Sequence, residues 1–216
     1  MRIKVCGITS FEDAAMALDL GVDALGFNFY PGSPRFLAPS SAGEIIHRLA
    51  PLAVTVAVFV NLGDTAEVER QARIAGVHVL QLHGDESPEY CLRLSGWKLI
   101  KALRLGSGSS PAGLERYPVA AFLLDARDDA RYGGTGLSFD WDIARQLQTA
   151  RPIILAGGLR PDNVRDAIRI VRPYAVDVCS GVESAPGRKD RGKLSAFIRE
   201  VRNAVREIDN SIAAPA

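Results

Sequence analysis

The chain has 216 residues, of which 47% are hydrophobic and 24% are charged, and its formal net charge is +1 at pH 7. This length and composition fit one compact domain over residues 1–216, with a disordered tail expected from about residue 209 to 216. Because the net charge is close to zero, bulk electrostatics excludes nucleic acid and an anionic membrane as partners. An anionic ligand therefore has to be held by local features.

The sequence also narrows the compartment and the cysteine chemistry. No stretch reaches the roughly 20 apolar residues that a membrane span needs, and the N-terminus lacks the regions of a secretion signal, so we expect a cytoplasmic protein. Cys6, Cys91 and Cys179 are an odd number without paired spacing, which fits neither a disulfide framework nor a zinc site. We expect three free thiols and no bound metal.

Eight short apolar runs follow one another along the chain, and most are nearly continuous, which is typical of parallel strands covered on both faces. They are RIKVC (2–6), DALGFNF (23–29), AVTVAVFV (53–60), HVLQLH (78–83), KLIKAL (98–103), VAAFLLDA (119–126), PIILAGG (152–158) and AVDVCSG (175–181). Segments of helical character separate these runs, so strand and helix alternate from end to end.

Capping residues mark two of the helical segments. Thr9 or Ser10 can open FEDAAMALDLG, and Asp64 can open TAEVERQARIAG. Both segments end at a glycine, Gly21 and Gly76, as a left-handed helix end favours.

The sustained alternation implies right-handed crossovers and a parallel sheet, and eight such units predict a compact α/β fold, a single-domain (β/α)8 TIM barrel. In the fifth unit, the Gly- and Ser-rich stretch RLGSGSSPAGLERYP (104–118) has room for only a short helix. The alternative is an open doubly wound sheet. Its dinucleotide signature G-x-G-x-x-G is missing from CGITSFED, which favours the barrel.

Active sites of TIM barrels lie at the carboxyl ends of the strands, so residues at the end of each apolar run are the candidates. They are Cys6, Asn28, Arg35, Asn61, His83, Asp125, Gly157, Gly158 and residues 177–181. The loops after the seventh and eighth strands, ILAGGLRPDNV and VDVCSGVES, combine small residues that let backbone N–H groups approach a ligand. They predict a phosphate pocket, although such glycines can also serve only a tight turn.

Each candidate side chain has a structural alternative. Cys6 and Cys179 are either reactive groups or small buried residues. Asp125 ends an apolar strand, which is costly unless it faces a polar cavity, caps a helix or joins a loop ion pair. His83 fits a catalytic site or a hydrogen-bonded core position, and Arg35 fits either a carboxylate clamp or an exposed loop arginine. Helical Cys91 is expected to be inert.

Together and in order, these motifs resemble the phosphoribosylanthranilate isomerase family of tryptophan biosynthesis. The matching stretches are KVCGIT, DALGFNFYPGSPR, VAVFVN, LQLHGDE, LLDA with GGTG, ILAGGLRPDNV and VDVCSGVESAPGRKD. They span nearly the whole chain, so the set is far more specific than any one motif.

The resemblance implies a role for each matching residue. Cys6 is expected as the general base and Asp125 as the general acid, while Arg35 is expected to hold the anthranilate carboxylate. The remaining residues are expected to bind the phosphate or orient the substrate. They are His83, Gly157, Gly158, Asp177, Ser180 and Gly181.

The implied reaction is an Amadori rearrangement of N-(5-phosphoribosyl)anthranilate, for which one acid and one base suffice without a metal, nicotinamide or flavin. The expected partner is a small phosphorylated substrate, and the expected state is a monomer. Two alternatives are open. The related histidine-pathway isomerase uses an aspartate where this chain has Cys6 and carries a phosphate site in each barrel half, whereas only the second half here shows such loops. A noncatalytic phosphate-binding barrel is the other alternative, against which an intact Cys6 and Asp125 argue.

Overall fold

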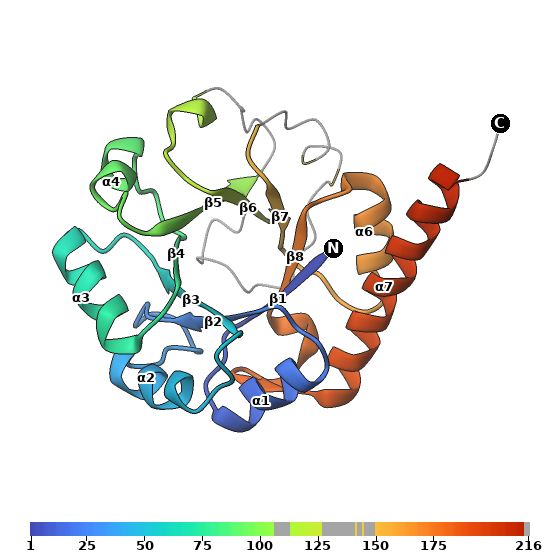
Figure 1. The fold of residues 1–216 in the computed structure, drawn as a ribbon, viewed down its shortest axis with the longest axis horizontal. Helices are drawn as coiled ribbons and strands as arrows, with labels where there is room; N and C mark the ends of the chain where they lie inside the picture. Colours follow the sequence, from blue (N-terminus) through green and yellow to red (C-terminus); the bar gives the residue numbers. More distant parts are fainter. Residues whose placement is uncertain (106–112, 127–140, 142–143, 145–149, 214–216) are drawn as a thin grey trace.

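The computed structural model is a closed barrel of eight parallel strands with helices around it, which confirms the predicted TIM barrel (Figure 1). It describes residues 1–105, 113–126, 141, 144 and 150–213. The strands are β1 (Arg2–Cys6), β2 (Ala24–Asn28), β3 (Val54–Phe59), β4 (Val79–Leu82), β5 (Lys98–Leu105), β6 (Ala121–Ala126), β7 (Ile153–Leu155) and β8 (Ala175–Val178). Each strand pairs with the next along the chain, and β8 pairs with β1 to close the barrel.

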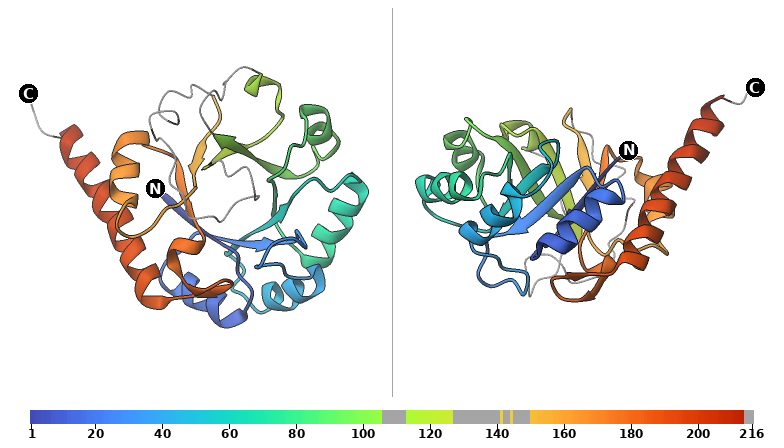
Figure 2. Two further views of the ribbon diagram at one scale, coloured as in Figure 1. Left: turned by 180° about the vertical axis from the view of Figure 1, so that it is seen from behind. Right: turned by 60° about the horizontal axis from the view of Figure 1, so that its bottom comes forward.

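Helices form the outer layer of the barrel in all three ribbon views (Figures 1 and 2). They are α1 (Phe11–Asp19), α2 (Pro39–His47), α3 (Thr65–Ala75), α4 (Pro88–Arg93), α6 (Val164–Val171) and α7 (Arg191–Ala213). Two short 3₁₀ helices, η1 (Leu114–Arg116) and η2 (Ser180–Val182), and a hairpin of β9 (Glu183–Ala185) with β10 (Arg188–Lys189) complete the described elements. None of the helices in this part of the chain is long and apolar enough to cross a membrane.

The predicted helix ends are confirmed. The side chain of Ser10 accepts a hydrogen bond from the backbone N–H of Asp13 at 3.2 Å, which opens α1. Asp64 caps α3 by accepting from the N–H of Ala66 at 2.9 Å. Gly76 closes α3 with a φ of 69°, a left-handed conformation that costs glycine little.

Three regions remain to be compared with the sequence expectations: the fifth unit, the motif GGTG and the C-terminus. After β5, the described residues of the fifth unit hold only η1, a single 3₁₀ turn, as expected. The motif GGTG, residues 133–136, lies outside the described residues. At the C-terminus α7 continues to Ala213, so the chain is helical beyond residue 209, where a disordered tail was expected to begin.

Side-chain alternation along the strands divides the core into two parts. One set of side chains points outward and packs against the helices, such as Val176 and Phe122, which are fully buried. The other set fills the barrel interior, with Ala175, Leu123 and Val56 among its buried members. Full burial of a large apolar side chain stabilises a fold by about 1.5–3 kcal/mol, so both layers hold the strand ends in place.

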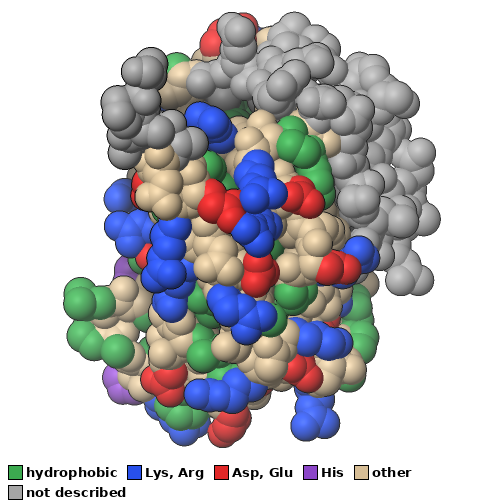
Figure 3. Space-filling view, turned by 90° about the vertical axis from the view of Figure 1, so that its right-hand side faces the viewer, with side chains coloured by type: hydrophobic (Ala, Val, Ile, Leu, Met, Phe, Trp, Pro, Cys, Tyr) green, Lys and Arg blue, Asp and Glu red, His purple; other side chains and the backbone are tan. Residues whose placement is uncertain are grey.

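The long helix α7 lies beside α6 and extends past the barrel (Figure 2). On the face seen in Figure 3, lysine and arginine side chains alternate with acidic ones. Between the two helices, Arg169 of α6 donates to Glu207 of α7 at 2.6 Å, and within α6 it donates to Asp166 at 3.2 Å. Such exposed pairs contribute little stability individually.

Candidate active site

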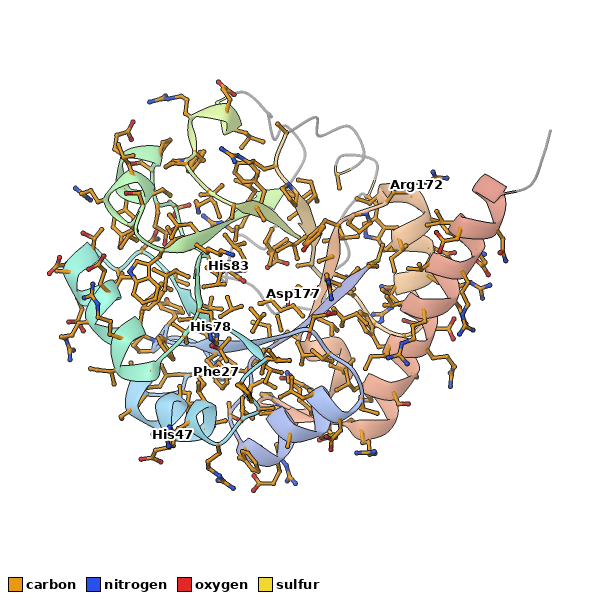
Figure 4. The ribbon with its side chains drawn as sticks, viewed as in Figure 1. Phe27, His47, His78, His83, Arg172 and Asp177 are labelled. Atoms are coloured by element: carbon orange, nitrogen blue, oxygen red, sulfur yellow. The ribbon has the colours of Figure 1, made fainter. Side chains whose placement is uncertain are left out.

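A cavity of about 640 Å³ opens at the carboxyl ends of the strands, where the sequence predicted the site. The predicted residues that line it are Cys6, Asn28, Arg35, His83, Asp125, Gly157, Gly158, Asp177, Cys179 and Ser180, whereas Asn61 is not among the described residues of its lining. Figure 4 shows His83 and Asp177 turned toward the middle of the barrel, whereas His47 and Arg172 lie on its outer side. Gly181 is not among the described residues that line the cavity; it lies where two loops pack together, as described below.

The pairing of β1 with β8 stacks two layers of polar side chains inside the barrel. Lys4 lies opposite Asp177 in the strand register, and its Nζ donates to both carboxylate oxygens at 2.9 Å. Both side chains are buried. One layer nearer the cavity, Cys6 follows Val5, which pairs with Val178, so Cys6 comes opposite Cys179.

A glycine on β2 makes room for the Lys4 side chain and for the sulfur of Cys6. A Cβ at Gly26 would stand 2.8 Å from Cys6 Sγ and 3.1 Å from Lys4 Nζ. The first distance is shorter than real Cβ contacts, and the second is tight. Glycine therefore leaves the room in which the cysteine and the lysine lie against the neighbouring strand.

The neighbours of Cys6 favour its thiolate. The adjacent Cys179 thiol is the largest cause that lowers the pKa of Cys6 well below its ordinary value; burial opposes this shift, and the ammonium groups of Lys4 and Lys189 add to it. The pKa of Cys179 is raised well above its ordinary value by Cys6 and by burial. Of the two sulfurs, Cys6 is the one whose surroundings favour the thiolate, and those of Cys179 favour the thiol.

Burial has different net effects on the pKa values of Lys4 and Asp177. For Asp177, burial outweighs the attraction of Lys4 and raises the pKa of the carboxyl to about 7. For Lys4, burial lowers the pKa, but Asp177 and Cys6 raise it by more, and the net direction is upward. The lysine charge below Cys6 is therefore permanent at neutral pH, while its carboxylate partner is divided between two forms.

A hydrogen-bonded chain leads to Asp125 on the other side of the cavity. Gln81 Nε2 lies 2.8 Å from His83 Nδ1, and His83 Nε2 lies 3.0 Å from Asp125 Oδ2. Because the amide N–H can only donate, this arrangement makes Nδ1 the acceptor and puts the imidazole proton on Nε2, facing Asp125. Asp125 Oδ1 makes no hydrogen bond to the described residues, so it is the oxygen that can face a substrate.

Arg35 lies in the cavity wall and is buried, which excludes the exposed-loop alternative. Its Nε and Nη2 donate to the Glu183 carboxylate at 2.6–3.1 Å, so a protein carboxylate already holds one edge of the guanidinium. Burial raises the pKa of Glu183, but Arg35 and Lys189 lower it by more, so the carboxylate is ionised. Lys189 Nζ also donates to the carbonyl of Cys6 at 2.6 Å, which ties the β9–β10 hairpin to the end of β1.

The two small-residue loops lie against each other, as their positions after β7 and β8 predicted. Gly157 and Gly158 both have positive φ, 80° and 64°, where L-residues with a Cβ are strained. A Cβ at Gly181 would stand 2.0 Å from the carbonyl oxygen of Leu159, so only glycine lets the second loop pack onto the first. Gly157, Gly158 and Ser180 face the cavity at this point.

Several residues of the site were not singled out from the sequence. They are Lys4, Gln81, Cys179 in its pairing with Cys6, Glu183 and Lys189. A charge or amide inside an apolar strand was the available signal for Lys4 and Gln81, since burial of such groups requires a partner. In the described part of the chain, no group of three His, Cys, Asp or Glu residues is placed to hold a metal ion.

Comparison with known proteins tests the family expected from the motifs. Residues 3–200 match the family described as N-(5'phosphoribosyl)anthranilate (PRA) isomerase. A protein of that activity from Geobacter metallireducens is 50% identical over 202 residues, covering 94% of this chain and 99% of the relative. The crystal structure of phosphoribosyl anthranilate isomerase from Thermus thermophilus has 40% identity and a TM-score of 0.87, covering 94% of this chain and 99% of that one.

A second solved structure carries a ligand. It is a phosphoribosyl anthranilate isomerase in complex with reduced 1-(o-carboxyphenylamino)-1-deoxyribulose 5-phosphate, with 37% identity and a TM-score of 0.79, covering 94% of this chain and 99% of that one. The family match, the high identity and the shared barrel agree with one another along the chain. This chain therefore belongs to the phosphoribosylanthranilate isomerase family.

Proposed function

We propose that Cys6 and Asp125 are the general base and the general acid with which this chain isomerises N-(5'-phosphoribosyl)anthranilate, the activity of its family in tryptophan biosynthesis. The observation that carries the assignment is their placement in one cavity, with a thiolate-favouring environment around Cys6 and a hydrogen-bonded chain behind Asp125. A base at the end of β1 and an acid at the end of β6 suit a substrate that lies across the cavity between these two strands.

In the first step, Asp125 gives a proton to the ring oxygen of the ribose. The bond from C1 to that oxygen breaks, the nitrogen lone pair forms a C1=N double bond, and the ring opens to a protonated Schiff base. His83 supports this step because its Nε2–H donates to Oδ2 and leaves Oδ1 to carry the proton.

In the second step, the Cys6 thiolate removes the proton from C2 of the sugar. The electron pair of that C–H bond forms a C1=C2 double bond, and the C=N electrons return to nitrogen to give the enolamine, which then ketonises to the product. The positive Schiff base acidifies C2–H and attracts the thiolate, so the base becomes most effective after ring opening. No redox cofactor enters this sequence, since one acid and one base move every proton.

The ends of the substrate have matching groups on opposite walls. The backbone of Gly157, Gly158 and Ser180 is suited to the phosphate, because small residues let N–H groups approach an anion closely. The relative in complex with a phosphorylated product analogue supports a phosphate in this family's barrel. Arg35 is suited to the anthranilate carboxylate through Nη1, the nitrogen that Glu183 does not occupy. Asp177, in the cavity floor, is suited to orient the sugar.

Turnover of the fluorescent anthranilate substrate tests the assignment. Wild type is expected to remove substrate fluorescence, and Cys6→Ala and Asp125→Asn are each expected to lower kcat by about 100-fold or more, the usual contribution of a positioned acid or base. The variant Cys91→Ala serves as the matched control, because Cys91 lies in α4 away from the cavity. Circular dichroism shows whether each variant is folded. An inactive wild type, or a folded Cys6→Ala with wild-type kcat, refutes the proposal.

Oligomeric state and location stay predictions. A monomer is our expectation, whereas the relative from Thermotoga maritima is described as dimeric, so sedimentation velocity of the full chain decides between them. A cytoplasmic location is supported by the chemistry proposed here, since a working Cys6 thiolate needs a reducing compartment.

A further inference from the structure

Two thiols face each other inside the barrel, on the first and last strands. The register pairs Val5 with Val178, so the next residues, Cys6 and Cys179, stand opposite each other. Side chains alternate along a strand, so Cys6 points the same way as Lys4, and Cys179 the same way as Asp177. The side chains of Lys4 and Asp177 meet inside the barrel at 2.9 Å, so the two cysteines also point into the barrel. Both cysteines line the cavity.

The spacing of this pair suits a disulfide. Neighbouring strands lie about 4.8 Å apart, and bridged cysteines have Cα atoms about 4.4–6.8 Å apart. Cys179 Sγ stands 3.1 Å from the position of a Cβ on Gly7, the residue that directly follows Cys6. Its sulfur therefore lies at the end of β1, beside the residue that follows Cys6, and the glycine leaves room for it there.

The two sulfurs also differ in the way that oxidation chemistry requires. Reaction with an oxidant begins at a thiolate, and a neighbouring thiol then resolves the product. Cys6 has the lowered pKa and Cys179 the raised one, so one is the attacking group and the other the proton-bearing partner. Cys91 has neither solvent access nor a lowered pKa, because it is fully buried in α4 and burial raises the pKa of its thiol to about 11.

We propose that Cys6 and Cys179 form an oxidation site, at which a hydroperoxide converts the thiol pair to a reversible disulfide. The Cys6 thiolate attacks one peroxide oxygen, the O–O bond breaks, and the other oxygen leaves as water or alcohol after taking a proton. The Cys179 thiol then displaces hydroxide from the Cys6 sulfenic acid, which releases water and forms the S–S bond. The sulfurs lose two electrons in total and the peroxide gains them.

Access to the pair is provided by the cavity that serves the substrate. Cys6 and Cys179 are both partly exposed, and a hydroperoxide is far smaller than the cavity volume of about 640 Å³. Oxidation removes the thiolate, so turnover stops until the disulfide is reduced by a dithiol. This effect on turnover rests on the proposed role of Cys6 as base, whereas disulfide formation itself does not.

Peptide mapping tests the disulfide without reference to activity. The protein is treated with hydrogen peroxide, its free thiols are blocked, and it is digested with trypsin without reductant. The expected product joins peptide 5–35, which contains Cys6, to peptide 170–188, which contains Cys179, with the loss of two hydrogen atoms. Peptide 74–93, which contains Cys91, is expected to stay a free thiol. Oxidation of Cys6 without the joined peptide overturns the proposal.

Recovery by dithiothreitol tests the role of the partner. Wild type and the control Cys91→Ala are expected to recover nearly all of their own starting activity. Cys179→Ser is expected to recover progressively less as exposure lengthens, because its Cys6 sulfenic acid has no resolving thiol and proceeds to sulfinic acid. Equal recovery in Cys179→Ser and wild type overturns the proposal. Should that variant fold poorly, peptide mapping of wild type decides alone, and an inactive wild type that still forms the joined peptide refutes only the proposed function.

Discussion

Replacing Lys4 by methionine is expected to slow the alkylation of Cys6, because the lysine charge stabilises the thiolate. Cys6 Sγ and Lys4 Nζ lie 2.8 Å and 3.1 Å from the same point, the position of a Cβ on Gly26. They are therefore at most about 6 Å apart, where two unit charges interact by about 3 kcal/mol at an effective dielectric constant of about 20. That energy corresponds to about 100-fold in thiolate population, and the opposing charge of Asp177 reduces the expected effect to roughly 10–100-fold.

The rate of Cys6 modification by iodoacetamide is the suitable assay, since it measures the thiolate independently of turnover. The rate is followed from neutral to acidic pH by the loss of unmodified Cys6 peptide in mass spectrometry. The comparison is made at acidic pH, where the wild-type rate falls as the pH is lowered, because the thiolate population there responds in full to a change in thiolate stability. Cys91, whose thiol pKa is raised to about 11 by burial, is expected to stay unmodified throughout and serves as an internal control.

The substitution Asp177→Asn tests whether removing a negative charge near Cys6 has the opposite effect on the alkylation rate from removing a positive one. It removes a negative charge from the same layer, so alkylation of Cys6 is expected to become faster or stay unchanged, the opposite direction to Lys4→Met. The variant with both substitutions controls for the buried carboxyl that Lys4→Met leaves without its ion-pair partner. If folded Lys4→Met has the wild-type pH profile, the electrostatic reasoning about Cys6 is wrong.

Three further substitutions address the rest of the site and the fold. Glu183→Gln is expected to raise KM about 10-fold with a smaller change in kcat, because Arg35 loses the charged partner that orients it; steady-state kinetics decide this, and an unchanged KM contradicts it. Gly181→Ala is expected to lower the melting temperature and weaken phosphate binding, since its Cβ would collide with Leu159; calorimetry with and without inorganic phosphate measures both. Asp64→Ala is expected to cost about 1 kcal/mol in urea unfolding while kcat stays unchanged, because it only caps α3.

The barrel could be predicted from the sequence because its signals are local. The strands of the barrel are covered on both faces, so most of them are nearly continuous apolar runs, and helices α1 and α3 carry their own capping residues. The hairpin of β9 and β10 was missed, since strands of three and two residues have no period to detect. The continuation of α7 beyond residue 209 was also missed.

The proposed acid and base and the proposed phosphate loops could be singled out because they lie at strand ends, where active sites of TIM barrels form. The partners of these residues could not be found in that way. The ion pair of Arg35 and Glu183 joins residues separated by 148 positions, and only the closed barrel brings them together. Lys4 is the exception. The argument that identified Asp125, a charge costly to bury without a partner, applies equally to a lysine inside RIKVC.

One structural relation underlies both the proposed base and the proposed oxidation site. The register of β1 on β8 sets Lys4 against Asp177 and Cys6 against Cys179, and this contact joins the first and last strands of the chain. A shift of β1 by one residue against β8 would turn Lys4 and Cys6 out of the barrel, away from Asp177 and Cys179. The reactivity of Cys6 therefore depends on barrel closure, since its lysine and its thiol partner are both held in place by the same strand pair.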